Sequence, residues 1–274
     1  MKDSKETVSI APMKVDGPQD FVNRNFRQSK DFQWVRELMK NAEEADATRV
    51  EFNIEWQGVE SKNVYRRLIA DNGKGMTAKQ LEDSFNGYGT SSKNVGGSHE
   101  NFGIGAKASL LPWNTSGIVV ISWVDGKPNM VRLCKDPKSN QYGLKQEKVW
   151  NETIEDYTPL TSVYDPAAIG DDGTGCDWSS LKPDFIKEHG TVIVLLGDSL
   201  DQDTILGVPD RKGEAKLKGI LKYLNRRFWE FSKIEVLVET LNTETKSNWP
   251  KSFKESRETK KSESQAQKRR ASGA

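Results

Sequence analysis

The sequence predicts an α+β fold, a two-layer sandwich in which helices cover one face of a mixed, mostly antiparallel sheet. Segments with helical periodicity and segments with strand periodicity follow one another without the strict β-α-β alternation of a parallel sheet. Asp125-Gly126 separates two apolar runs, residues 117–124 and 129–135, and this pattern is typical of a hairpin. Strands that are joined in this way are antiparallel.

The composition is that of a folded domain with long polar segments. The 274 residues are enough to bury a full core, and eight Trp argue against disorder although only 35% of the residues are hydrophobic. The formal net charge is +1, so no global field draws the chain to nucleic acid or to a membrane. Cys134 and Cys176 are the only cysteines and give no disulfide framework, and the two histidines lack metal-ligand spacing.

The sequence shows no targeting or membrane-spanning pattern. No apolar run approaches the length of a membrane span, and the N-terminal residues lack the apolar core of a signal peptide. We therefore expect a protein without membrane contact, cytoplasmic or, in a eukaryote, nuclear.

The expected elements follow one another from residue 30. A helix begins after its cap Ser29 and runs to about Ala47, and strands follow over residues 49–56 and 64–70, joined by a loop. Helices are expected over residues 77–85 and 102–113, where Pro112 helps to end the second of them. The later elements are the hairpin of 117–135, a buried strand over 190–197, a helix over 216–231 and a final strand over 233–240.

Residues 30–246 are expected as one domain that contains an insertion, with one further segment on each side of it. Residues 1–29 are expected as an arm, 136–188 as an irregular insertion, and 247–274 as a disordered polar tail. Residues 251–274 hold eight Lys or Arg against three Glu. This charge run either solvates the tail, the simpler interpretation, or contacts nucleic acid.

The first helix carries a polar stripe as well as an apolar one. Glu37, Asn41 and Glu44 share one face, opposite the stripe formed by Phe32, Val35, Met39 and Ala42. A solvated face is the simpler explanation, although Asn has poor helix propensity. The alternative is the wall of a site, in which Asn41 offers an oxygen to Mg²⁺ and Glu37 deprotonates a nearby water.

Two glycine-rich segments suit a ligand as well as a turn. In "DNGKGM", Gly73 and Gly75 either form a simple turn or let the backbone approach a flat ligand, while Asp71 accepts a hydrogen bond from an amine. In "FGIGAK", Gly103 and Gly105 leave N–H groups free before a helix, and Lys107 adds a charge for phosphate. The intervening "GYGTSSKN" is either a solvated loop or a mobile lid.

Together these segments resemble the GHKL, or Bergerat-fold, ATPase family of gyrase B subunits, ninety-kilodalton heat-shock chaperones, histidine kinases and MutL. "ELMKNAEEA" resembles the helical motif, with Glu44 where aspartate is commoner, and "DNGKG" resembles the adenine motif. "GTSSK" and "ENFGIGAK" resemble the lid and phosphate motifs, with Glu100 where the family usually has a first glycine. Gly190 and Thr191 resemble the fourth motif, which opens a buried strand.

The resemblance implies a site for ATP and Mg²⁺ with Glu37 as general base and Asn41 as the magnesium ligand. It implies that Thr191 joins Asp71 and a water around adenine. The residues that it implies in nucleotide binding, besides Asn41, are Asp71, Gly73, Gly75, Met76, Thr90, Ser91, Ser92, Lys93, Gly103, Ile104, Gly105, Ala106, Lys107 and Thr191. The tryptophans are expected in core and interface packing, and Trp34, which lies beside the polar stripe, is the one to test for proximity to the nucleotide.

The implied function is a slow, Mg²⁺-dependent ATPase that works as a clamp, in which two copies close on each other and exchange residues 1–29. The sequence looks more like MutL, MORC and chaperone ATPases than like histidine kinases, which normally have no Glu at the place in the helical motif that Glu37 occupies here. Such relatives usually have a second domain that supplies a Lys or Arg to the γ-phosphate, and residues after 240 leave no room for one. The chain is therefore expected to be a fragment, to act with a partner, or to bind ATP and hydrolyse it poorly. The alternative is a nucleotide-responsive module that binds DNA or a protein client with little hydrolysis of its own.

Overall fold

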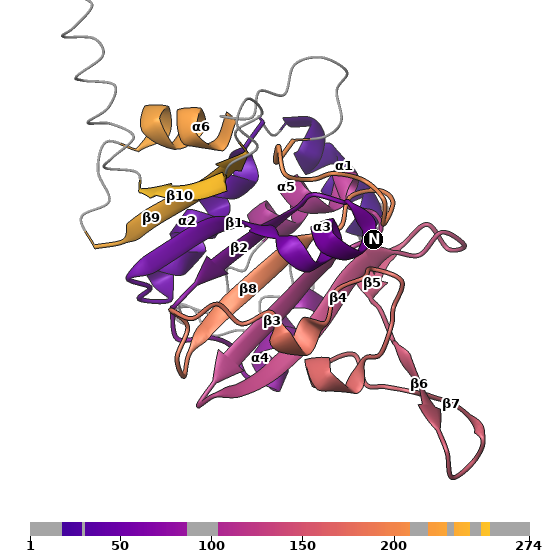
Figure 1. Ribbon diagram of the computed structural model, residues 1–274. Coiled ribbons are helices and arrows are strands. Elements are labelled where there is room, and N and C mark those ends of the chain that lie inside the picture. Colours follow the sequence, from indigo (N-terminus) through magenta and orange to yellow (C-terminus); the bar gives the residue numbers. More distant parts are fainter. Residues whose placement is uncertain are drawn as a thin grey trace, which may run out of the picture.

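One mixed sheet organises the part of the chain that the computed structural model describes, residues 18–28, 31–86, 104–208, 219–228, 233–241 and 248–252. Its eight strands have the order β10-β9-β1-β2-β8-β3-β4-β5, and helices cover one of its faces (Figure 1). Among these strands β1 and β9 are parallel, whereas every other neighbouring pair is antiparallel. The predicted fold class, an α+β sandwich with a mostly antiparallel mixed sheet, is confirmed.

The bounds of the elements are as follows. The strands of the large sheet are β1 (Arg49–Glu55), β2 (Arg66–Asp71), β3 (Ile118–Val124), β4 (Lys127–Lys135), β5 (Tyr142–Leu144), β8 (Gly190–Leu195), β9 (Glu235–Leu241) and β10 (Asn248–Ser252). A separate ribbon pairs β6 (Lys148–Asn151) with β7 (Asp156–Pro159). The α-helices are α1 (Pro18–Gln28), α2 (Gln33–Glu44), α3 (Trp56–Lys62), α4 (Ala78–Asn86), α5 (Ile104–Leu110) and α6 (Gly219–Arg227), and the 3₁₀ helices are η1 (Leu111–Trp113), η2 (Pro166–Ala168) and η3 (Trp178–Ser180).

The larger core lies between the sheet and the helices. Strand alternation places Ile69 of β2, Val120 of β3 and Ile193 of β8 on this side. From α2 it receives the buried side chains of Trp34, Val35, Leu38, Met39 and Ala42. Full burial of an aliphatic side chain stabilises by roughly 1.5–3 kcal/mol, so this packing fixes which face of α2 points away from the core.

The opposite face of the sheet carries a second core. Leu68, Val119 and Val194 point to this side and are covered by Tyr164, Cys176, Trp178 and Ile186. Residues 136–188, expected as an irregular insertion, thus complete the fold: they add β5 to the sheet and cover its second face. Burial on both faces explains why β3 and β8 are continuous apolar runs.

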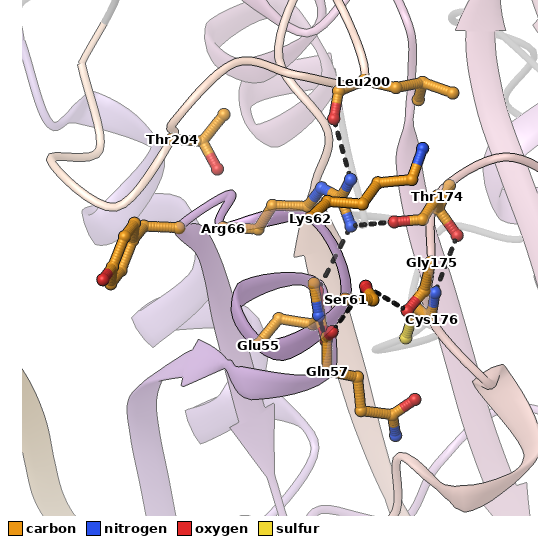
Figure 2. Close-up of polar contacts among 12 residues, drawn as sticks. Glu55, Gln57, Ser61, Lys62, Arg66, Thr174, Gly175, Cys176, Leu200 and Thr204 are labelled. Carbon is orange, nitrogen blue, oxygen red and sulfur yellow. Dashed lines mark hydrogen bonds and ion pairs between the residues drawn. The ribbon is translucent and has the colours of Figure 1, made fainter.

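A buried polar cluster fastens this covering segment to β2 and α3 (Figure 2). Arg66 Nη1 lies 3.2 Å from Glu55 Oε2 and donates to the Thr174 carbonyl oxygen at 2.9 Å, and Nη2 donates to the Leu200 carbonyl oxygen at 2.8 Å. Glu55 also caps α3, because its carboxylate accepts from the Gly58 N–H at 2.8 Å. Neither charged side chain has exposed surface. The cluster therefore joins three segments that are distant in sequence.

Several boundaries differ from the predictions. α3 occupies residues that were expected as a loop, and the cap by Glu55 supplies the local reason. α2 begins at Gln33, after Phe32 in a left-handed conformation with φ of 65°, and the predicted cap Ser29 lies outside the described residues. The helix expected over 216–231 is described over Gly219–Arg227.

Both ends of the domain also differ from the expected organisation. β10 pairs antiparallel with β9, so the strand expected over 233–240 is not the last, and the sheet continues past residue 246. α1 lies within the expected arm of residues 1–29, yet its Val22 is buried in the larger core. The rest of that arm and residues 253–274 lie outside the described residues. Among the described helices, none combines the length and the apolar character needed to cross a membrane.

Candidate functional site

α2 carries the polar stripe of the predicted site. Glu37 and Asn41 are one turn apart and partly exposed, whereas Val35, Leu38 and Met39 are buried. Gln33 Nε2 donates to Glu37 Oε1 at 2.7 Å, one helical turn away. Gln33 was missed by the sequence reasoning, although its spacing of four residues from Glu37 could have indicated the contact.

The start of α5 contacts this stripe at Glu37. A Cβ atom at Gly105 would lie 2.6 Å from Glu37 Oε2 and 2.8 Å from its Cδ atom. A larger residue at 105 would therefore displace the carboxylate. The structure thus brings a glycine of the predicted phosphate segment against the predicted general base.

The other end of α2 contacts the turn after β2. A Cβ atom at Gly73 would lie 2.7 Å from the Cβ atom of Ala45, the residue that follows α2. The Lys74 N–H donates to the Ala45 carbonyl oxygen at 3.0 Å, and Lys74 Nζ donates to the Glu44 carbonyl oxygen at 3.2 Å. Asn72 Oδ1 accepts from two backbone N–H groups at the start of β1, at 2.9 and 2.8 Å. These contacts hold the predicted base-binding turn against the helix.

Gly75 is required by the path of this turn. Its φ of 67° lies in the left-handed region, and a Cβ atom there would lie 2.0 Å from the Trp123 carbonyl oxygen. The next residue, Met76, donates its N–H to Ser122 Oγ at 2.8 Å. The turn is therefore fixed against β3 as well as against α2.

Three polar side chains form a row across the ends of the central strands. Asp71 of β2 is the cross-strand partner of Thr191 in β8, and Thr191 is the partner of Ser122 in β3. Ser122 Oγ and Thr191 Oγ1 are 2.9 Å apart. The sequence reasoning predicted that Asp71 and Thr191 lie together and missed Ser122, whose signal is a lone hydroxyl within "IVVISWV".

Lys107 of the predicted phosphate segment lies against the end of α4. Its Nζ donates to the Ser84 carbonyl oxygen near the end of α4 at 2.6 Å, and 3% of the residue is exposed. Burial lowers the pKa of Lys107 to about 8. In this arrangement the ammonium group joins α5 to α4.

The remaining predicted site residues divide into two groups. Thr90, Ser91, Ser92, Lys93 and Gly103 lie outside the described residues, whereas Ile104 begins α5 and Ala106, in the same helix, is buried. Trp34, the tryptophan singled out for a test near the nucleotide, is buried. Its Nε1 donates to the Gly207 carbonyl oxygen at 2.7 Å, and its ring is buried in the larger core.

Comparison with known proteins identifies the class of this fold and site. The family model for histidine kinase-, DNA gyrase B-, and HSP90-like ATPases matches residues 32–170, just over half of the chain. The chain belongs to this ATPase family, which agrees with the predicted GHKL resemblance and supports ATP binding.

One solved structure illustrates the likeness. The B-subunit of the DNA gyrase from Myxococcus xanthus is 15% identical with a TM-score of 0.41, and the match covers 80% of this chain and 49% of that chain. This chain therefore spans about half the length of the gyrase subunit. A comparison with curated proteins gives no match.

The Asp71→Asn variant is expected to be more stable than the wild type at neutral pH. Burial raises the pKa of Asp71 from 3.8 to about 6, although the Gly73 N–H, which donates to Oδ1, lowers it. Since the raised pKa belongs to the folded state, the wild type loses stability as the pH rises from about 4 to about 6. The gain from the substitution is on the order of 1–2 kcal/mol at pH 7 and disappears at pH 3.

Urea unfolding at pH 3 and pH 7 measures this difference. Asp83→Asn, on the exposed side of α4, is the matched control. A variant that is less stable than the wild type at pH 7 would contradict the expectation. The expected gain would mean that the fold does not require the Asp71 carboxylate.

Proposed function

We propose that this chain binds ATP with Mg²⁺ along α2 and hydrolyses it slowly. The observation that carries the proposal is that α2 and the residue after it contact both glycine-rich segments: Glu37 lies against Gly105, and Ala45 lies against Gly73. Asn41 lies midway between these contacts, because residues 37, 41 and 45 are each four apart on a helical stripe. The adenine base of the nucleotide would lie at Asp71, and its phosphates would lie at the start of α5.

The oxygen chemistry of this stripe suits Mg²⁺. Asn41 offers an amide oxygen, a hard donor, and Mg²⁺ is commonly held by one or two protein groups together with phosphate oxygens and waters. Within the described residues there is no group of three His, Cys, Asp or Glu side chains that could hold a metal by itself. A bound Mg²⁺ would neutralise charge that develops on the phosphates.

Glu37 would be the general base of hydrolysis. Its carboxylate accepts a proton from water while the water oxygen bonds to the γ-phosphorus, and the bond from that phosphorus to the bridging oxygen breaks to release ADP. Glu37 Oε1 accepts from Gln33 and Oε2 lies towards Gly105. Gln33 would therefore orient the Glu37 carboxylate, so that Glu37 Oε2 lies on the side of the phosphates.

The other residues would position the nucleotide and close the site. The adenine base would be contacted by Gly75, Met76 and Thr191. The phosphates would be contacted by Gly103, Ile104, Ala106 and Lys107. Thr90, Ser91, Ser92 and Lys93 would form a lid that γ-phosphate contacts hold shut, and closure would favour a homodimer.

Titration with a non-hydrolysable ATP analogue, with and without Mg²⁺, tests the proposed ligand. We expect calorimetry to detect binding that Mg²⁺ strengthens, and light scattering on the same samples to show twice the monomer mass only with the analogue. ADP is the control, because it lacks the γ-phosphate that would hold the lid. No binding under either condition would overturn the proposed site, whereas binding without a change in mass would overturn only the clamp.

A second candidate is a nucleotide-responsive module that binds DNA or a protein client with little hydrolysis. The eight Lys or Arg against three Glu in residues 251–274 favour DNA. Phosphate contacts release counterions, so affinity for duplex DNA would fall steeply with salt. Affinity for duplex DNA that is absent, or that is independent of salt, would exclude DNA as the partner.

A further inference from the structure

A buried serine connects the elements around the proposed base site. Ser122 of β3 has no exposed surface, and its Oγ lies 2.8 Å from the Met76 nitrogen. The same Oγ lies 3.0 Å from the Gly190 carbonyl oxygen and 2.9 Å from Thr191 Oγ1. Ser122, itself in β3, therefore ties the glycine-rich turn to β8.

The hydrogen-bonding capacity of these groups sets the direction of each contact. A serine hydroxyl has one proton and two lone pairs. The Met76 N–H can only donate and the Gly190 carbonyl can only accept, so Ser122 accepts from the first and donates to the second. The remaining lone pair of Ser122 accepts the proton of Thr191, and Thr191 Oγ1 then has only lone pairs for a further partner.

Asp71 supplies a second acceptor beside Thr191. The two residues are direct cross-strand partners, and both alternate with residues of the larger core, so their side chains share the helix-covered face. Asp71 Oδ1 already accepts from the Gly73 N–H at 2.9 Å. Two adjacent acceptors suit the amino group of a 6-aminopurine and a water bonded to its ring, and they disfavour the carbonyl oxygen of a 6-oxopurine.

We propose that Ser122 is a positioning residue that fixes Thr191 as a hydrogen-bond acceptor and thereby selects 6-aminopurine over 6-oxopurine nucleotides. This inference rests on the proposed function, in which the base lies at Asp71. Ser122 acts through Thr191 and, by holding the Met76 N–H, through the turn that carries Gly75. It does not itself contact the nucleotide.

Calorimetric affinities for ADP and IDP test the proposal without hydrolysis. The wild type is expected to prefer ADP to IDP. Ser122→Ala is expected to lower the ratio of the ADP affinity to the IDP affinity by about fivefold, because the variant loses the one hydrogen bond that orients the Thr191 hydroxyl. Thr191→Val, which removes the hydroxyl itself, is expected to lower the ratio at least as much. The double variant should match Thr191→Val alone, because Ser122 acts through Thr191.

Thr204→Val is the matched control for loss of a buried hydroxyl. Thr204 Oγ1 donates to the Leu195 carbonyl oxygen and accepts from the Arg67 N–H, so its loss should lower stability and leave the ratio unchanged. An unchanged ratio in Ser122→Ala, or multiplicative losses in the double variant, would overturn the inference. Failure of the wild type to bind ADP would instead overturn the proposed function. If Ser122→Ala does not fold, Ser122→Cys, a weak donor and acceptor, must lower the ratio in the same direction.

Discussion

Replacing Glu37 by glutamine is expected to lower the rate of ATP hydrolysis by about 10²–10⁴-fold, the usual contribution of a positioned general base. Glutamine has the shape of glutamate and can lie against Gly105 without a new contact, but its amide cannot take the proton of water. Nucleotide affinity should stay within about threefold of the wild-type value, since the loss concerns the transition state. Single-turnover measurement of phosphate release with excess protein separates this step from product release.

The matched control for this variant is Glu43→Gln. Glu43 is an exposed carboxylate on the same helix and lies outside the stripe of Glu37 and Asn41. Both variants change the net charge of α2 equally, so a difference between their rates reports the position of the carboxylate. Equal rates in wild type and Glu37→Gln would remove Glu37 as the base. Nucleotide binding by a wild type that gives no phosphate release would favour the module with little hydrolysis.

Local patterns in the sequence predicted the parts of the site that depend on neighbours along the chain. The apolar stripe of α2 requires that Glu37 and Asn41 lie on the side away from the core. Asp71 ends a strand and Gly73 follows it, so the turn and its polar residue could be placed from sequence spacing alone. The hairpin around Asp125-Gly126 was predicted for the same reason and is confirmed by the pairing of β3 with β4.

Features that depend on register or on distant partners were not predictable in this way. Ser122 becomes part of the site because β3 pairs with β8 in a register that puts Thr191 opposite it. β10 contains polar residues and a proline, and it is a strand because it pairs with the edge of β9. The position of the Lys107 ammonium group depends on the Ser84 carbonyl oxygen near the end of α4, which is 23 residues away in the sequence. No local periodicity carries information of this kind.

The second core shows the same limit on a larger scale. Residues 136–188 are rich in turn formers and have little periodicity, which favoured an insertion. Their apolar residues are nevertheless spaced to cover the face of the sheet that the helices leave open, as Tyr164 and Trp178 do. The continuous apolar runs of β3 and β8 were the signal for this covering layer, because a strand with one solvated face alternates.

Arg66→Ala is expected to destabilise the protein by about 3–5 kcal/mol, the usual effect of removing one partner of a buried ion pair. The substitution leaves the Glu55 carboxylate buried without its charge partner. It also removes the donors to the carbonyl oxygens of Thr174 and Leu200, which hold the covering segment on β2. Urea denaturation followed by tryptophan fluorescence measures the loss, since Trp178 lies in the second core.

Two further variants separate the ion pair from the attachment of the segment. Lys62→Ala removes an exposed side chain that donates to the Gly173 carbonyl oxygen in the same segment, and it should cost less than about 1 kcal/mol. Combining Arg66→Met with Glu55→Gln removes both charges, and it should recover part of the loss because no unpaired charge remains buried. If Arg66→Ala were as mild as Lys62→Ala, the cluster would not be what holds residues 173–200 on the sheet. Full recovery in the double variant would show that charge burial, and not the two carbonyl contacts, accounts for the effect.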